Sequence, residues 1–159
     1  MLTHHRKPVC LSLISTDLPV RSVMETLMTL YQKGRDRFLL MLTAPLEPNF
    51  PTLENLQDRA QSSPRIVWID ISPEKTIMTM QGNKQLSYRH FWQQGVYGMT
   101  RYWLPAQATQ LQKSICLCNY TRSLIFKGHP VPEYLRVEYE LWAQEVQLGN
   151  YILTLEIKQ

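Results

Sequence analysis

Residues 134–143, YLRVEYELWA, alternate between apolar and polar side chains almost without a break. One parity of this stretch carries Leu135, Val137, Tyr139 and Leu141. The other parity carries Arg136, Glu138, Glu140 and Trp142. Because successive side chains of a strand point to opposite faces, the stretch predicts a strand with one face in a core and the other face in water.

The same period of two continues through most of the chain after Arg65. Alternating segments cover 65–72, 75–80, 84–92, 95–105, 110–128 and 151–158. Turn-forming sequences separate several of them, such as QGN at 81–83 and LGN at 148–150. The parity of the longest segment shifts at 121–123, which indicates a β-bulge. We therefore expect an antiparallel sheet in this part of the chain.

Residues 17–33 predict a different element, because their apolar residues recur at helical spacing. These residues are Val20, Val23, Met24, Leu27, Leu30 and Tyr31. Thr16 or Asp17 can cap such a helix, Pro19 suits its first turn and Gly34 suits its end. An amphipathic helix of this kind packs on one face of a sheet.

Apolar strands are expected on either side of this helix, at 8–15 and 36–45. Residues 46–64 are rich in proline and predict an irregular loop with one short helix, and residues 1–7 predict a flexible tail. We expect a single α+β domain spanning 1–159. Its antiparallel sheet carries one main helix on one face, and the other face is polar enough for the sheet to curl into a half-barrel.

The composition is that of an ordinary globular domain, with 44% hydrophobic and 19% charged residues. A chain of this length can bury roughly 70% of its unfolded surface. No apolar run approaches the ~20 residues that span a bilayer, so no transmembrane segment is expected. Cys10, Cys116 and Cys118 lack the spacing of a disulfide framework, which favours a reducing compartment and a cytoplasmic location.

Charge is distributed unevenly along the chain. The whole sequence has a formal net charge of +4 at pH 7. Residues 130–159 contain two basic and five acidic residues, a net charge of −3, so the preceding residues carry +7. A basic body is compatible with a polyanionic partner, and equally with pairing between the two parts of the chain.

The sequence patterns of catalytic and cofactor sites are absent. Glu138 and Glu140 would lie about 6 to 7 Å apart on one strand face, close to the spacing of glycosidase carboxylates. A solvated charge ladder with Arg136 on the same face, and with Lys158 and Arg122 across the meander, explains that row more simply. His90 lies inside a predicted strand, but no motif makes it part of a catalytic triad. No metal-binding or phosphate-binding spacing occurs, so we expect neither a metal nor a cofactor.

Basic and aromatic residues are interleaved in YRHFW at 88–92 and MTRYW at 99–103. Trp, Tyr and Arg dominate the energetics of protein interfaces, and single-strand nucleic-acid binders combine stacking rings with cations. The candidate binding residues are Tyr88, Arg89, His90, Trp92, Arg101, Trp103 and Arg122.

These residues are compatible with three functions. The favoured one is a non-catalytic accessory or adaptor protein that binds another protein through an aromatic sheet face, because every catalytic pattern tested is absent. The second is a subunit that binds RNA or single-stranded DNA, with Arg89 and Arg101 among its contacts. The third is a small-ligand cup, or an enzyme, inside the curved sheet near His90 and Tyr88.

Overall fold

The computed structural model describes residues 4–44, 65–82, 85–103 and 113–158. In these segments the chain forms ten β-strands and no helix, and so no helix with the length and hydropathy needed to cross a bilayer. The strands are β1 His4–Ser15, β2 Arg21–Gly34, β3 Arg37–Ala44, β4 Arg65–Ile71, β5 Lys75–Gly82, β6 Gln85–Gln93, β7 Tyr97–Trp103, β8 Ser114–Lys127, β9 Tyr134–Ala143 and β10 Val146–Ile157.

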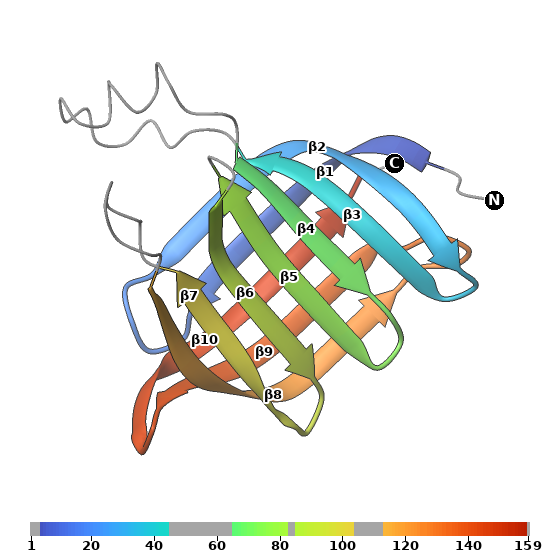
Figure 1. Ribbon diagram of the computed structural model, residues 1–159. Coiled ribbons are helices and arrows are strands. Elements are labelled where there is room, and N and C mark those ends of the chain that lie inside the picture. Colours follow the sequence, from blue (N-terminus) through green and yellow to red (C-terminus); the bar gives the residue numbers. More distant parts are fainter. Residues whose placement is uncertain (1–3, 45–64, 83–84, 104–112, 159) are drawn as a thin grey trace, which may run out of the picture.

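The ten strands form one closed antiparallel barrel in the order β1-β10-β9-β8-β7-β6-β5-β4-β3-β2 (Figure 1). Each strand pairs with its neighbours in sequence, and β1 also pairs with β10. Val9, for example, lies opposite Thr26 of β2 and opposite Ile157 of β10. The amide of Lys158 donates a further hydrogen bond of 2.9 Å to the carbonyl of Pro8. This seam turns a meander into a barrel, which removes the unpaired edges of an open sheet.

The expectation of an α+β fold with a main helix at 17–33 is wrong, because this segment contains β2. Met28 and Leu30 are buried inside the barrel, and the backbone of β2 pairs with both β1 and β3. Asp17 does not cap a helix. Its carboxylate accepts hydrogen bonds from the backbone and side-chain nitrogens of Asn150, at 2.9 and 3.3 Å. The segment 16–20 therefore joins two strands and is fastened to β10.

The antiparallel arrangement of the later strands is confirmed, and the sheet closes completely where a half-barrel was expected. The predicted bulge is confirmed as well, because the β8–β9 register shifts between Thr121 and Ser123. The short helix expected within 46–64 lies outside the described residues. Of the expected tail at 1–7, residues His4–Lys7 form the start of β1.

The barrel interior is aliphatic along β1–β4 and along most of β9 and β10. Buried side chains there include Val9, Leu30, Leu40, Leu42, Val67, Ile69, Ile71, Leu135, Val137, Leu153 and Leu155. Each such side chain contributes about 1.5–3 kcal/mol by leaving water. Residues 128–133 cover one end of the barrel, where Val131 packs against the core and Pro132 is buried. The amide of Ile157 donates to the carbonyl of Glu133 at 3.0 Å and fixes this segment in place.

Candidate functional site

Polar and aromatic side chains replace the aliphatic ones in the part of the interior that β6–β10 supply. These strands are consecutive neighbours in the barrel (Figure 1). We call this group the interior cluster; it consists of Tyr88, His90, Trp92, Thr100, Tyr102, Asn119, Tyr139 and Tyr151. The strand register brings its members together, since Tyr88 lies opposite Tyr102, His90 opposite Thr100, and Tyr139 opposite Tyr151.

A short hydrogen-bond chain runs through the middle of the interior cluster. The side-chain nitrogen of Asn119 donates to the hydroxyl oxygen of Thr100 at 2.8 Å. The same hydroxyl lies 3.0 Å from Nδ1 of His90. While it accepts from Asn119, the hydroxyl of Thr100 can either donate its proton to Nδ1 or accept a proton from an Nδ1–H, so the hydrogen bond forms in either imidazole tautomer. All three residues are buried, so this chain fixes the orientation of the imidazole.

Aromatic rings surround the imidazole of His90 on several sides. The indole of Trp92 stacks on it with ring centroids 4.9 Å apart and an interplanar angle of 10°. Tyr88, Tyr102 and Tyr139 follow at 5.2, 5.6 and 5.8 Å. Ring pairs at such distances are stabilising beyond the area they bury. The imidazole is thus enclosed by rings and by one neutral hydroxyl.

This enclosure keeps His90 uncharged. Burial lowers the pKa of His90 from 6.5 to about 3, because an imidazolium inside the barrel would lose its hydration without gaining a carboxylate partner. A general base works best with a pKa near the operating pH. His90 is therefore poorly suited to catalysis with Thr100, although the two side chains are within hydrogen-bond distance.

Four tyrosines of the interior cluster share one region of the barrel. Burial, with a smaller contribution from Tyr151, raises the pKa of Tyr102 to about 12. Burial also raises the pKa of Tyr88 and Tyr139, and in both cases the neighbouring Tyr102 adds to the effect. Their rings lie close together, with centroids 6.2 Å apart for Tyr88 and Tyr102 and 5.5 Å apart for Tyr139 and Tyr151. At neutral pH the phenols are uncharged groups that both donate and accept hydrogen bonds.

The tyrosines mark the end of the barrel at which β1, β7 and β9 finish and β6, β8 and β10 begin. We call it the tyrosine end. Seven inward-facing side chains near this end are half-buried, whereas others such as Leu42 and Leu141 are buried. The half-buried ones are Leu13, Met24, Met80, Tyr88, Tyr102, Leu117 and Tyr151. Solvent therefore reaches part of the surface of these apolar and phenolic side chains.

Several buried polar atoms next to the interior cluster have no hydrogen-bond partner in the structure. They are Nε1 of Trp92, Oδ1 of Asn119, and the hydroxyl oxygens of Thr76 and Thr121. Thr76 lies opposite Trp92 across β5 and β6, and Thr121 lies opposite Tyr139 across β8 and β9. A buried polar atom without a partner costs about 1–3 kcal/mol. Four such atoms inside one half of a barrel call for a ligand or bound water to satisfy them.

The sequence-predicted binding residues are divided between the two surfaces of the barrel. Tyr88, His90 and Trp92 belong to the interior cluster, and Trp92 is completely buried. Arg89, Arg101, Trp103 and Arg122 lie on the opposite parity and face outward. The structure therefore does not bring the seven residues together into one site. It forms an inward group and an outward group from the same strands.

Glu138 and Glu140 lie on the outer surface of β9, as the alternation predicts. The carboxylate of Glu138 is 3.4 Å from the guanidinium of Arg136, and that of Glu140 is 3.4 Å from Arg122. Lys158, the other expected partner, pairs with Glu25 at 3.4 Å. The two carboxylates belong to a solvated charge ladder, and they do not face a common substrate space.

Five members of the interior cluster were not among the candidate binding residues from the sequence: Thr100, Tyr102, Asn119, Tyr139 and Tyr151. A usable signal exists for Asn119, which shares its parity with Ile115 and Leu117 and so interrupts an apolar row. A polar residue on the apolar face of a strand predicts a buried hydrogen bond or a ligand contact. Thr100 offers no such signal, because its importance comes from its position opposite His90.

The described residues contain no group of three or more His, Cys, Asp or Glu that could hold a metal ion. What the interior cluster offers is a set of flat rings, hydroxyls, an indole N–H and an amide oxygen, without a charged side chain. Such a set can bind an uncharged molecule and orient it by hydrogen bonds, because a charged ligand would find no counter-ion to replace its hydration.

No family model and no curated protein matches this chain. Among solved structures, the chain is similar to the ywiB protein from Bacillus subtilis, with a TM-score of 0.58 and 13% sequence identity. The match covers 99% of this chain and 96% of that one. At this identity the likeness supports the fold alone, and it extends over the whole barrel.

Proposed function

We propose that this protein binds a small molecule inside the tyrosine end of its barrel. The observation that carries the proposal is the set of four buried, unpartnered polar atoms on Trp92, Asn119, Thr76 and Thr121. Trp92 and Asn119 belong to the interior cluster, whose members Tyr88, Tyr102 and Tyr151 are half-buried. Antiparallel barrels of this kind are wide enough to hold one small ligand within the sheet.

The chemistry of the interior cluster defines the class of ligand. A flat ring would stack on Tyr88, Tyr102 or Tyr151, and a hydroxyl, carbonyl or amide would pair with the phenols. The ligand would be uncharged, since His90 is neutral and no Asp, Glu, Lys or Arg belongs to the cluster. The adaptor function expected from the sequence is less well supported, because three of its proposed contact residues face the interior.

A fluorescent probe with the required chemistry tests this proposal. N-phenyl-1-naphthylamine is uncharged, has flat rings and one N–H group, and fluoresces strongly when it leaves water. Titration of the wild-type protein is expected to give a saturable increase in fluorescence. Tyr102→Ala removes an inward ring and is expected to weaken binding about tenfold, which is the scale of one well-packed aromatic contact.

Tyr97→Ala provides the matched control, because Tyr97 is a tyrosine of the same strand that faces outward. Its binding of the probe is expected to equal that of the wild type. Absence of saturable binding to the wild type, or equal affinities for the two variants, would contradict the proposal. Tyr102→Phe keeps the ring and removes only the hydroxyl. Weaker binding by this variant would therefore come from a lost hydrogen bond and not from a disrupted barrel.

A cytoplasmic location remains part of this proposal. Cys10, Cys116 and Cys118 are free thiols, and Cys116 is exposed. Exposed free thiols are typical of proteins from a reducing compartment. Labelling of the native protein with a thiol reagent immediately after cell lysis is expected to modify Cys116, and complete protection of that residue by oxidation would contradict this location.

A further inference from the structure

The strands that supply most of the interior cluster also build an unusual outer surface. Residues 75–132, which include β5–β8, contain no Asp and no Glu. The same residues contain seven basic side chains: Lys75, Lys84, Arg89, Arg101, Lys113, Arg122 and Lys127. Because β5–β8 are consecutive neighbours, their outward faces form one continuous side of the barrel (Figure 1). Of these cations, Arg122 pairs with Glu140 of β9 at 3.4 Å, and β5–β8 themselves contribute no carboxylate to this side.

Two of these cations are held directly side by side. Arg89 of β6 lies opposite Arg101 of β7 in the antiparallel register, with both side chains on the outer face. Like charges in this arrangement destabilise a sheet. No carboxylate among the described residues pairs with either guanidinium. The contacts of Arg101 are the sulfur of Met99, at 3.7 Å, and the ring of Trp103, whose centroid lies 5.7 Å from the guanidinium carbon.

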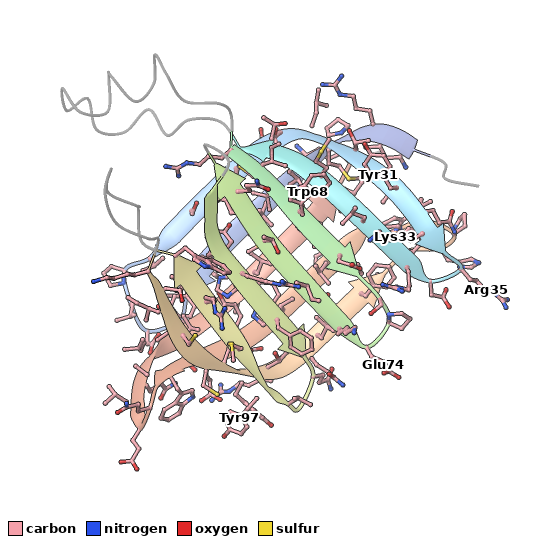
Figure 2. The ribbon with its side chains drawn as sticks, in the orientation of Figure 1. Tyr31, Lys33, Arg35, Trp68, Glu74 and Tyr97 are labelled. Carbon is pink, nitrogen blue, oxygen red and sulfur yellow. The ribbon has the colours of Figure 1, made fainter. Side chains whose placement is uncertain are left out.

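One exposed ring, that of Tyr97, lies on the same outer face of β7 as Arg101. Tyr97 is 66% exposed and Met99 is 54% exposed, large values for apolar side chains within a barrel strand. Figure 2 shows Tyr97 extending away from the barrel. The ring of Tyr120 on β8 lies beside it, with centroids 4.8 Å apart. Along β7 the outward residues from Tyr97 to Trp103 span about 20 Å. We call the six residues Arg89, Tyr97, Met99, Arg101, Trp103 and Tyr120 the outer patch.

We propose that the outer patch binds single-stranded nucleic acid. The charge of this side complements a phosphate backbone, and a phosphate between Arg89 and Arg101 would relieve their mutual repulsion. Tyr97 and Trp103 offer ring faces on which unpaired bases stack. A protein partner could use the rings, but it would need to bring carboxylates, whereas single-stranded nucleic acid supplies both a ring and an anion in every residue.

This surface is independent of the small-molecule site, because it uses the opposite parity of the same strands. The two proposals therefore separate experimentally through one pair of variants. Tyr97→Ala is expected to weaken nucleic-acid binding about tenfold and to keep the binding of N-phenyl-1-naphthylamine. Tyr102→Ala is expected to behave in the opposite way.

The experiment is a fluorescence anisotropy titration of a labelled 12-nucleotide single-stranded RNA of mixed sequence at 50, 100 and 200 mM NaCl. Arg89→Gln/Arg101→Gln removes two phosphate contacts, which is expected to reduce the slope of log affinity against log salt by about 1.4. The matched control is Lys33→Gln/Arg35→Gln. It removes the same charge from the β2–β3 hairpin, away from Tyr97 (Figure 2), and is expected to leave the slope unchanged. Tyr97→Ala is expected to reduce affinity about tenfold at constant salt, with an unchanged slope.

Three further arms make the result decisive. A single-stranded DNA of the same sequence shows whether the outer patch prefers RNA or DNA. Binding of either one supports the proposal. A fully paired hairpin that binds as tightly as the single strand overturns it, because stacking would then play no part. Vesicles with 30% phosphatidylserine that bind while both oligonucleotides fail also overturn it.

If the wild type binds neither oligonucleotide at 50 mM NaCl, the proposal is overturned. It is also overturned if the Arg89/Arg101 double variant and the Lys33/Arg35 double variant bind the oligonucleotide equally well. Arg89 is exposed and Arg101 is half-buried, so the melting temperature of the double variant is measured together with its binding. A melting temperature equal to or above that of the wild type therefore shows that lost binding does not come from lost folding.

Discussion

The neutral imidazole of His90 predicts a specific dependence of stability on pH. The ordinary pKa of histidine is 6.5, and burial lowers the pKa of His90 to about 3. Below pH 6.5 the unfolded chain therefore takes up a proton that the folded chain refuses. The contribution of neutral His90 to the free energy of unfolding is therefore fully present above pH 6.5, and it is lost as the pH falls from 6.5 towards 3.

The size of the effect follows from the two pKa values. Each pH unit between them costs about 1.4 kcal/mol, so lowering the pH from 7.5 to 4.5 removes about 2.7 kcal/mol of unfolding free energy. That is a large share of the 5–15 kcal/mol that typical domains possess. Asp17 does not interfere, because hydrogen bonds from Asn150 and Ser15 lower its pKa from 3.8 and its contribution fades only below that value.

Urea denaturation at pH 7.5 and 4.5 measures this quantity for the wild type and for His90→Gln. Glutamine is of similar size and does not titrate, so the variant is expected to lose about 2.7 kcal/mol less than the wild type over this range. His129→Gln replaces an exposed histidine in the β8–β9 connection and serves as the control. Equal losses in the wild type and His90→Gln would refute the reasoning, because His90 would then ionise without leaving the barrel.

Two further predictions concern packing, and both are measured by urea denaturation. Gly98→Ala is expected to destabilise the barrel by about 1–3 kcal/mol, because a Cβ atom there would lie 2.4 Å from the carbonyl oxygen of Phe91. Gly34→Ala is the control, since the nearest atom would be 4.0 Å away, and an equal effect at both glycines would contradict the close approach. Leu40→Ala is expected to cost about 2–5 kcal/mol, because Leu40 is completely buried. Leu27→Ala should cost below 1 kcal/mol, since Leu27 is 46% exposed, and a similar cost at both leucines would refute the assigned orientation of β2.

The later strands could be predicted from the sequence because each has apolar side chains on one face and polar side chains on the other. In β9 the charged row faces water, and in β10 Tyr151, Leu153, Leu155 and Ile157 form one row on the inward parity. A strand of this kind has only one orientation that buries its apolar row. Local pattern and tertiary structure agree there.

The segment 17–33 could not be assigned in this way because two periods fit it. A helical stripe is present, and so is a strand row of Met24, Met28 and Leu30 that Thr26 interrupts. Exposed Val23 and Leu27 on the outer face complete the helical pattern by coincidence. The choice between the two depends on pairing with β1 and β3, which no local window contains.

The interior cluster was only partly predictable for a related reason. In β7 the more apolar parity, with Met99 and Trp103, faces outward, whereas Gly98, Thr100 and Tyr102 face inward. Hydrophobicity alone therefore points to the wrong face of this strand. The aromatic residues of β6 drew attention to Tyr88 and His90, but their partners come from strands whose register only the closed barrel defines.

The pairing of β1 with β10 has a consequence for how the chain reaches its native state. Hydrogen bonds such as that between Lys158 and Pro8 join β1 to the end of β10, so the barrel cannot close until β10 has been synthesised. Until then β1 retains an open edge on the emerging chain, and contacts between segments so distant in sequence form slowly. Ribosome-bound nascent chains truncated before β10 are therefore the species most exposed to aggregation and to chaperone capture.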